Sequence, residues 1–536
     1  MFTAPAAGVE PRAEVQYNFG YIWTISLVAA LGGLLFGYDW VVIGGAKPFF
    51  EPFFEIHGNS GALWDSFLSG WANSCALVGC LFGAMGAGAL SDRYGRKWLL
   101  TISAMIFVVT SIGNALAPNF LCFVLWRIMG GTAIGLASNL SPVYISEVAP
   151  AGMRGRLVSI NQLTIVSGVL LAQITNWLLG NGFHELPGMS EIDKAELIRT
   201  SWYGTTCWRW MFGLTAVPSA LFFLGMFFVP ESPRWLLKRR REKAARDVLR
   251  RIGGDSYASA AVAEIEGTLA SETEQVDFRE LFDPRLKKVL ALGVVLAVFQ
   301  QWCGINVIFN YAADIFKNAG YGVSGALTNI VATGAVSMLF TIGALGVVDR
   351  GGRRPLMLWG AAGMVLVCVV LRVFGVGPTS WQMLVLALAA LGYCLMSRLP
   401  SGRRSLMLLG AAGLAVIYVA LGIGYAVGAE GWPMLALVLA AIGCYSMSLA
   451  PITWVILSEI FPNRIRGAAM AVSVSSLWIA CFLLTVTFPT LQKLLGMAGV
   501  FWLYAVICVA GFFYILRRLP ETKGKTLEEI EKELVD

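Results

Sequence analysis

Two segments, Gly88-Ala-Leu-Ser-Asp-Arg-Tyr-Gly-Arg-Lys97 and Asp349-Arg-Gly-Gly-Arg-Arg354, share an Asp-Arg pair followed by Gly-Arg and a second basic residue. Each segment follows a long apolar run. Glycine permits a tight turn there, and the charges can pair with those at neighbouring helix ends. The repetition of one loop indicates a chain built from two parallel halves. Charge that only fixes membrane topology is the alternative explanation.

The composition around these loops is that of a membrane protein. Of 536 residues, 57% are apolar and 14% are charged, and the mean hydropathy is +0.69. A soluble globular protein could not cover that much apolar surface, so lipid is the expected solvent for most of the chain.

Apolar runs of roughly 20 residues, the length that crosses about 30 Å of hydrocarbon, recur along the chain. The first run, 22–46, is too long for the apolar core of a signal peptide and is expected to be a span. We predict fourteen spans, at 22–46, 67–90, 98–117, 120–146, 157–180, 209–229, 287–313, 325–348, 355–375, 382–398, 405–427, 432–460, 466–488 and 496–518.

These spans predict five regions. They are a cytoplasmic N-terminus (1–21), a six-helix bundle (22–229), a basic helical linker (230–286), a second bundle with an extra hairpin (287–518) and a cytoplasmic tail (519–536). The loops that are rich in Arg all fall on one side, which the positive-inside rule assigns to the cytoplasm.

The extra hairpin arises from a tandem duplication, because the segment that starts at Gly352-Arg-Arg recurs from Gly402-Arg-Arg over about 50 residues. The added spans cover about 355–398. Only the second copy continues into Trp454 and Glu459, so we expect the second copy in the functional place and the first outside the bundle. Twelve spans plus a re-entrant hairpin remain an alternative, since the second added span is short.

Residues with catalytic or metal-binding potential do not cluster. The ten cysteines lie mostly in apolar runs without CxxC spacing, and the two histidines, His57 and His184, lie in polar loops. We therefore expect no metal, no cofactor and no enzyme activity. The net charge of +7 is explained by the basic loops and does not imply nucleic acid.

Further motifs join the two signatures: Pro230-Glu-Ser-Pro-Arg-Trp-Leu236, Gln300-Gln-Trp-Cys-Gly-Ile-Asn306, Pro520-Glu-Thr-Lys-Gly-Lys-Thr526, and Glu-x6-Arg-Gly after both the fourth and the tenth spans. Together they resemble the sugar porter family of the major facilitator superfamily over nearly the whole chain. The resemblance implies an all-α major facilitator fold of two six-helix bundles and about fourteen spans here, in a bacterial plasma membrane.

The resemblance implies sugar ligands at Gln162, Gln300, Gln301, Asn306 and Trp454. A side-chain amide both donates and accepts, as sugar hydroxyls do, and an aromatic face packs on the C–H surface of a sugar. A hydrogen bond between helices is the alternative role for an isolated Gln. The family pattern is altered at Val169, Asn310, Ser337, Leu477 and Cys481, which leaves the preferred sugar open.

Asp39, in Leu34-Leu-Phe-Gly-Tyr-Asp39, is an acid inside the first span, and Arg127 in the fourth span is its expected partner. A carboxylate in hydrocarbon is costly unless it is paired or protonated, so it is a functional hypothesis by default. The family's proton-coupled members have an acid here, so its presence favours proton coupling. A purely structural brace is the alternative.

The resemblance also implies a gating network of charges on the cytoplasmic side. Its expected members are Asp92, Arg93, Arg96, Glu147, Arg154, Asp349, Arg350, Arg353, Glu459 and Arg466.

The expected function is transport of a hexose or pentose by alternating access, with a proton as co-substrate and the lipid bilayer as surroundings. A facilitative uniporter is the alternative, and a non-transporting sugar receptor is a third possibility that the short C-terminal tail disfavours. We expect the chain to act as a monomer, with both termini cytoplasmic.

Overall fold

The structure is a computed structural model that describes residues 16–56, 61–183, 191–271, 284–348, 403–461 and 466–521. Within these ranges every regular element is a helix, so the predicted all-α class is confirmed. Helices are expected because they satisfy their own backbone N–H and C=O groups in hydrocarbon. The predicted hairpin at 355–398 and the signature residues Asp349, Arg350 and Arg353 are not among the described residues.

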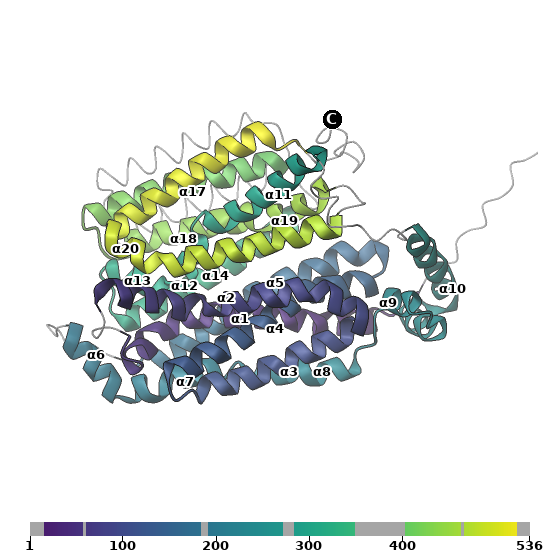
Figure 1. The fold of residues 1–536 in the computed structure, drawn as a ribbon, viewed down its shortest axis with the longest axis horizontal. Coiled ribbons are helices and arrows are strands. Elements are labelled where there is room, and N and C mark those ends of the chain that lie inside the picture. Colours follow the sequence, from purple (N-terminus) through teal and green to yellow (C-terminus); the bar gives the residue numbers. More distant parts are fainter. Residues whose placement is uncertain are drawn as a thin grey trace, which may run out of the picture.

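The helices before the linker pack against one another and are called the first half (purple to blue in Figure 1). They are α1 (Phe19–Phe53), α2 (Ala62–Tyr94), α3 (Arg96–Ala115), α4 (Phe120–Val148), α5 (Arg154–Gly180), α7 (Trp208–Gly213) and α8 (Ala216–Phe228). A short π-helix, Tyr203–Cys207, leads into α7, and a 3-10 turn, Ala151–Met153, precedes α5.

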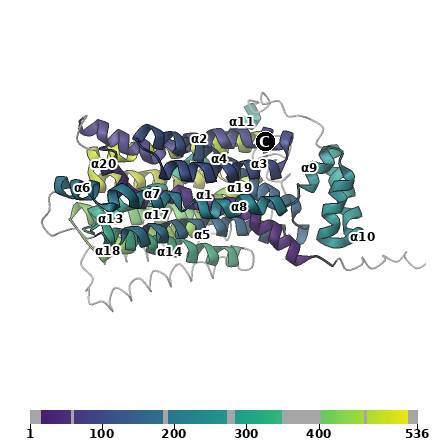
Figure 2. The same cartoon turned by 90° about the horizontal axis from the view of Figure 1, so that it is seen from below.

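Three further helices mark the two ends of this bundle. Helix α6 (Glu191–Thr200) lies at one end, and α9 (Pro233–Lys238) and α10 (Glu242–Ser271) lie at the other (Figures 1 and 2). These ends are called the α6 end and the α10 end.

The helices after the linker form the second half (teal to yellow in Figure 1). They are α11 (Pro284–Trp302), α12 (Ile305–Asn310), α13 (Ala312–Asn318), α14 (Val323–Val348), α17 (Arg403–Ala426), α18 (Trp432–Met447), α19 (Leu449–Ile460) and α20 (Arg466–Arg518). Gly304 separates α11 from α12 with φ 87°, and Gly496 breaks α20 with φ 68°. Both values lie where a side chain would be strained.

Eleven helical stretches of the described chain are long and apolar enough to cross a membrane. The last, Ala468–Arg518, is two helices that meet at Gly496. A polytopic membrane protein is thus confirmed, whereas the count of fourteen spans and the inserted hairpin stay predictions. Helix α17 packs on α20 and α18 packs on α14, and these two helices carry the second copy of the duplication.

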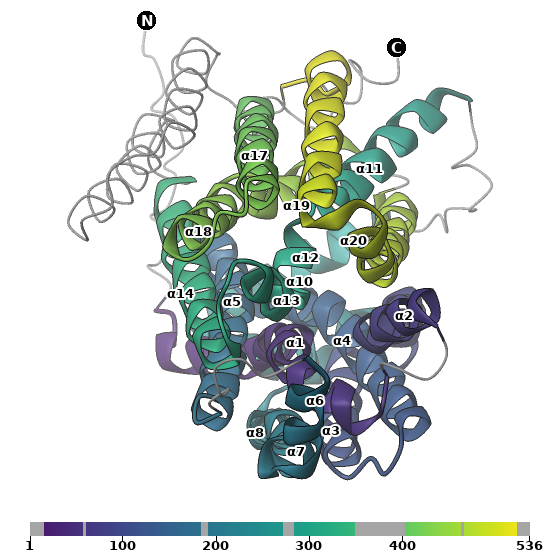
Figure 3. The same ribbon diagram turned by 90° about the vertical axis from the view of Figure 1, so that its left-hand side faces the viewer.

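The two halves contact each other along three lines. Helix α2 packs on α20, α5 packs on α14, and α1 packs on α12 and α13 (Figure 3). Backbones approach closely there: a Cβ added at Gly70 would lie 2.2 Å from the carbonyl oxygen of Val486, and one at Gly44 would lie 2.5 Å from that of Phe309. Small residues permit such close packing of membrane helices.

Candidate functional site

A buried ion pair joins α1 to α4 in the middle of the first half. The side chain of Arg127 is 2% exposed and that of Asp39 is 8% exposed, and Nη1 of Arg127 lies 2.9 Å from Oδ1 of Asp39. Both Nη groups also approach the carbonyl oxygen of Asp39 at 3.4 Å, and the guanidinium lies 5.4 Å from the centre of the Phe212 ring. The pairing that the sequence predicted is therefore confirmed.

Some polar atoms of this ion pair do not form hydrogen bonds within the described part of the chain. Oδ2 of Asp39 and Nε of Arg127 have no hydrogen-bond partner among the described residues. A small cavity of about 10 Å³ borders Arg127, Asn73 and Asn310, and Oδ1 of Asn73 is likewise without a partner in that part of the chain. A polar cavity of this size is at the lower limit for one water molecule. The two side chains are thus joined by one contact, and a small polar cavity lies beside them.

A cluster of amides lies where α11 ends and α12 begins. Asn306 donates to Oε1 of Gln301, and Nε2 of Gln301 lies 3.4 Å from Oε1 of Gln300. Gln300 in turn donates to the carbonyl oxygen of Ala450 at 3.5 Å. The break at Gly304 lies between Gln301 and Asn306, and the three amides of this short segment hydrogen-bond to one another across it.

The amide cluster also contacts α20. Nδ2 of Asn306 lies 3.6 Å from Sγ of Cys481, one of the positions where the family pattern is altered. Ser337, another altered position, pairs with Ser446 at 3.3 Å between their hydroxyl oxygens. Asn310, a third, is 3% exposed and borders the cavity beside Arg127. Two altered residues thus border the polar clusters: Cys481 lies beside the amides and Asn310 beside the cavity at Arg127.

The other two predicted sugar ligands are not joined to this cluster. Gln162 is half-buried on α5, and Trp454 is 41% exposed on α19. No hydrogen bond links either side chain to the amides within the described ranges. They stay predictions as sugar ligands.

Charges gather at the α10 end of the first half. Nε of Arg96 lies 3.1 Å from Oε2 of Glu147, and Nη1 of Arg96 lies 3.2 Å from Oδ1 of Asp92. Asp92 also pairs with Lys238 at 3.0 Å. Arg93 lies over the ring of Tyr94, and Arg154 is exposed at the start of α5.

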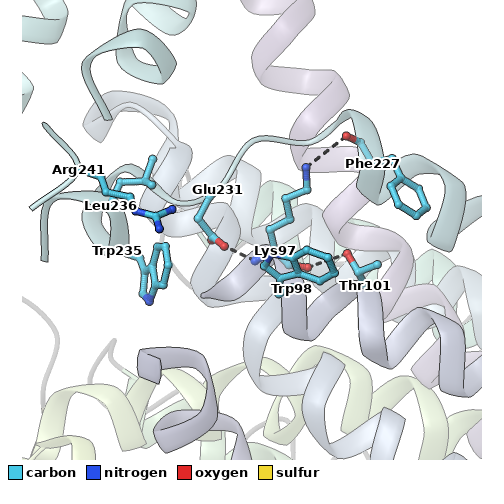
Figure 4. Close-up of a pocket in the computed structure, with 8 residues that line it drawn as sticks. All are labelled: Lys97, Trp98, Thr101, Phe227, Glu231, Trp235, Leu236 and Arg241. Carbon is cyan, nitrogen blue, oxygen red and sulfur yellow. Dashed lines mark hydrogen bonds between the residues drawn. The ribbon is translucent and has the colours of Figure 1, made fainter. Parts of the chain in front are cut away.

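The carboxylate of Glu231 caps the N-terminus of α3 (Figure 4). Its carboxylate accepts from the backbone N–H groups of Arg96 at 2.9 Å and Lys97 at 3.1 Å. Burial raises the pKa of the Glu231 carboxyl above its usual value, and these backbone hydrogen bonds partly offset the rise. An acid at this position satisfies N–H groups that have no partner inside the helix.

The same arrangement recurs in the second half. Arg403, at the start of α17, forms an ion pair with Glu459, at the end of α19. The backbone N–H of Arg403 donates to Oε1 of Glu521 at 2.8 Å, as that of Arg96 does to Glu231. Glu231 and Glu521 each follow a proline after the last span of their half. The two halves therefore carry equivalent charge clusters, as parallel repeats should.

Arg403 was missing from the predicted network, which contained Arg353 instead. The two arginines occupy equivalent positions in the tandem duplication, Gly352-Arg353 and Gly402-Arg403. That alignment was the available signal, because a helix pair that enters the bundle brings its own arginine to Glu459. Arg466 begins α20, and its role stays a prediction.

We therefore expect Arg403→Gln to impair transport at least tenfold and Arg353→Gln to change it less than twofold. Removing Arg403 leaves Glu459, whose side chain is 21% exposed, without its charged partner, a loss of roughly 1.5–3 kcal/mol. Uptake rates of the two purified variants would measure this. Equal loss in both would mean that the first copy also contributes to the network.

The halves are joined at the α6 end. Lys47 of α1 pairs with Asp314 of α13. Between α5 and α14, Gln173 donates to Thr333 at 3.2 Å and Trp177 donates to Thr328 at 3.1 Å. By contrast, the ion pairs described at the α10 end each stay within one half. The structure is thus closed at the α6 end.

Two pseudo-equivalent helical halves around buried polar clusters define a membrane transporter of the major facilitator type. The family model named "Sugar (and other) transporter" matches residues 25–397 and 392–534. The chain belongs to this family, which confirms the resemblance drawn from the motifs.

Individual relatives of this chain support the same family assignment. The chain is 34% identical to the D-xylose-proton symporter of Escherichia coli K12, covering 97% of this chain and 96% of the relative. It is 35% identical to the glucose transport protein of Synechocystis sp. PCC 6803, covering 96% and 97%. The inward-open conformation of the xylose transporter XylE from E. coli matches with a TM-score of 0.74 at 32% identity, covering 96% of this chain and all of that one.

Proposed function

We propose that this protein transports a monosaccharide together with a proton by alternating access. The observation that carries the proposal is the buried Asp39–Arg127 pair in a chain whose second half holds a cluster of uncharged amides. A buried carboxyl group and a neutral polar site supply the two binding functions that symport needs.

Protonation of Asp39 is the coupling step in this proposal. Its carboxylate makes one direct contact with Arg127 through Oδ1, and Oδ2 is left without a partner among the described residues. A proton on the carboxyl removes most of its attraction to the guanidinium, which frees α1 to move relative to α4. The small polar cavity beside Arg127 lies next to this pair and is at the lower limit of size for one water molecule.

The amide cluster binds the sugar. Gln300, Gln301 and Asn306 satisfy one another in this structure, and sugar hydroxyls would replace those mutual hydrogen bonds. Gln162 and Trp454 complete the site from α5 and α19. Xylose and glucose are the first sugars to test, since relatives that transport them share about a third of the sequence.

The α10 end faces the cytoplasm in this proposal, because the basic loops and the linker lie there. The closed α6 end is then extracellular, and the state described is inward-facing. Both termini are cytoplasmic, in a bacterial plasma membrane.

The protein acts as a monomer in this proposal. One chain, with its bundles at 22–229 and 287–518, supplies both halves of the transport site.

The duplicated hairpin is an addition to this fold. We keep the count of fourteen spans and place the first copy, 355–398, outside the bundle, because α17 and α18 already provide the helices that pack on α20 and α14.

Uptake of labelled glucose, xylose and fructose into proteoliposomes, with and without an inward proton gradient, tests the proposal. Gradient-dependent accumulation of one sugar is the expected result. Uptake that only equilibrates would indicate a uniporter, and saturable binding without uptake would indicate a receptor.

Replacing Gln301 with Ala should raise the KM for sugar at least tenfold with a smaller change in kcat. The substitution removes an amide that can both donate to and accept from sugar hydroxyls, and two such hydrogen bonds at about 1 kcal/mol each correspond to more than tenfold. Gln492→Ala, at a half-buried amide just before the break at Gly496 in α20, is the matched control and should leave KM unchanged. An equal KM in both variants would exclude Gln301 from the sugar site.

A further inference from the structure

Three charged side chains meet where the two halves close at the α6 end. Lys47 and Glu51 lie one turn apart on α1 and are 5% and 6% exposed. Nζ of Lys47 lies 3.8 Å from Oε1 of Glu51 and forms an ion pair with Asp314 of α13, whose side chain is 25% exposed. One buried ammonium thus faces two carboxylates, one from each half.

The surroundings hold this ammonium in place. Ser69 of α2 donates to Oε1 of Glu51 at 2.6 Å, so Glu51 is also fixed to the first half. Lys47 lies 4.9 Å from the centre of the Tyr311 ring, and the hydroxyl of Tyr311 donates to the carbonyl oxygen of Thr485 at 2.7 Å. The cluster therefore spans α1, α2, α20 and the boundary of α12 and α13.

Glu51 and Asp314 would move differently relative to Lys47 when the two halves separate. Glu51 is on the same helix as Lys47 and would move with it, whereas Asp314 would move away with α13. A buried ammonium that lost its only partner would be strongly destabilised. Glu51 removes that penalty, because it remains within reach. Asp314 is already partly exposed and lies in the first turn of α13, where a negative charge is favourable.

The local backbone suits such a movement. Pro48 and Pro52 lie inside this end of α1, and each lacks the N–H that would bond to the preceding turn. Prolines in helices are common positions of bending. The segment that carries Lys47 is thus weakened where the halves must part.

We propose that Lys47 is a gate residue that exchanges partners during transport: it pairs with Asp314 across the halves when the α6 end is closed and with Glu51 alone when that end is open. This inference rests on the alternating-access movement of the proposed function. It assigns opposite roles to the two acids, since Asp314 stabilises the closed gate and Glu51 stabilises the open one.

Amide hydrogen exchange of the full-length protein in lipid nanodiscs, followed by mass spectrometry of peptides that cover α13 and the start of α14, tests the proposal. Asp314→Asn should speed exchange there about tenfold, because it removes the negative charge that pairs with Lys47 across the two halves. Lys47→Met should act in the same direction at least as strongly, since it leaves two carboxylates facing each other. Glu51→Gln should slow exchange several-fold.

The decisive result is that Glu51→Gln slows amide exchange while Asp314→Asn speeds it. A merely structural salt-bridge cluster would be loosened by every one of these changes, so faster exchange in Glu51→Gln, or no change in Asp314→Asn, would overturn the proposal. Asp314 is partly exposed, so its variant remains informative if Lys47→Met does not fold. Arg199→Gln removes an exposed ion pair with Glu55 at the same end and should stay within twofold of the native protein.

This readout does not depend on the transported substrate. Exchange is measured without sugar and without a proton gradient, so the gate can be confirmed even if the uptake experiments exclude sugar symport. Conversely, unchanged exchange in all variants alongside gradient-driven uptake would reject the gate and leave the proposed function intact.

Discussion

Replacing Asp39 with Asn should abolish proton-driven accumulation of sugar while sugar exchange across the membrane continues. Asn keeps an acceptor oxygen near Nη1 of Arg127, which lies 2.9 Å from Oδ1 in the native protein, but it cannot bind and release a proton. A gradient of one pH unit corresponds to about 1.4 kcal/mol and supports about tenfold accumulation at one proton per sugar. In the variant the ratio of internal to external sugar should fall to about one.

Proteoliposome uptake with a fixed pH gradient, and counterflow without one, measure the two quantities separately. Asp247→Asn, at an exposed acid on α10, is the matched control and should accumulate sugar as the native chain does. If the native chain and Asp39→Asn equilibrate sugar equally, the protein is a facilitator and the Asp39–Arg127 pair only braces α1 against α4. If exchange is lost as well, the substitution has damaged the fold.

The ion pair and the amide cluster could both be predicted from short stretches of the sequence. Asp39 and Arg127 stood out because charges in hydrocarbon are rare and need partners, and the structure joins them directly. The amides at 300, 301 and 306 were recognisable because they crowd into one short segment around Gly304. The roles of Gln162 and Trp454 depended on the family resemblance alone, and the structure leaves them apart from the cluster.

Contacts between distant segments were not predictable in the same way. Lys47 and Asp314 are separated by 267 positions, and each taken alone resembles a charge at the end of a span. The choice between Arg353 and Arg403 required knowing which copy of the duplication enters the bundle, and two nearly equal sequences do not decide that. The pairing of Arg403 with Glu459 depends on the packing of α17 against α19, a tertiary property.

Close packing of α2 on α4 sets the position of Arg127, and it depends on glycine. A Cβ added at Gly79 would lie 1.9 Å from the carbonyl oxygen of Ile128, the residue after Arg127, and one at Gly131 would lie 1.9 Å from that of Ala76. These carbonyl oxygens belong to the helix backbone, so they cannot move aside as the end of a flexible side chain can. The two helices must therefore separate if either glycine gains a side chain.

Gly79→Ala should accordingly destabilise the protein by about 1–3 kcal/mol or more, as overpacking does, and should reduce sugar uptake because Arg127 shifts away from Asp39. Gly88→Ala is a control on the same helix, since its added Cβ would meet nothing within 4 Å. In that open position Ala should be neutral or stabilise the helix by about 0.5–1 kcal/mol. Thermal unfolding of both variants in detergent, together with uptake, would measure the difference. Equal unfolding temperatures would mean that α2 and α4 lie farther apart than described, and the Asp39–Arg127 contact would then need another support.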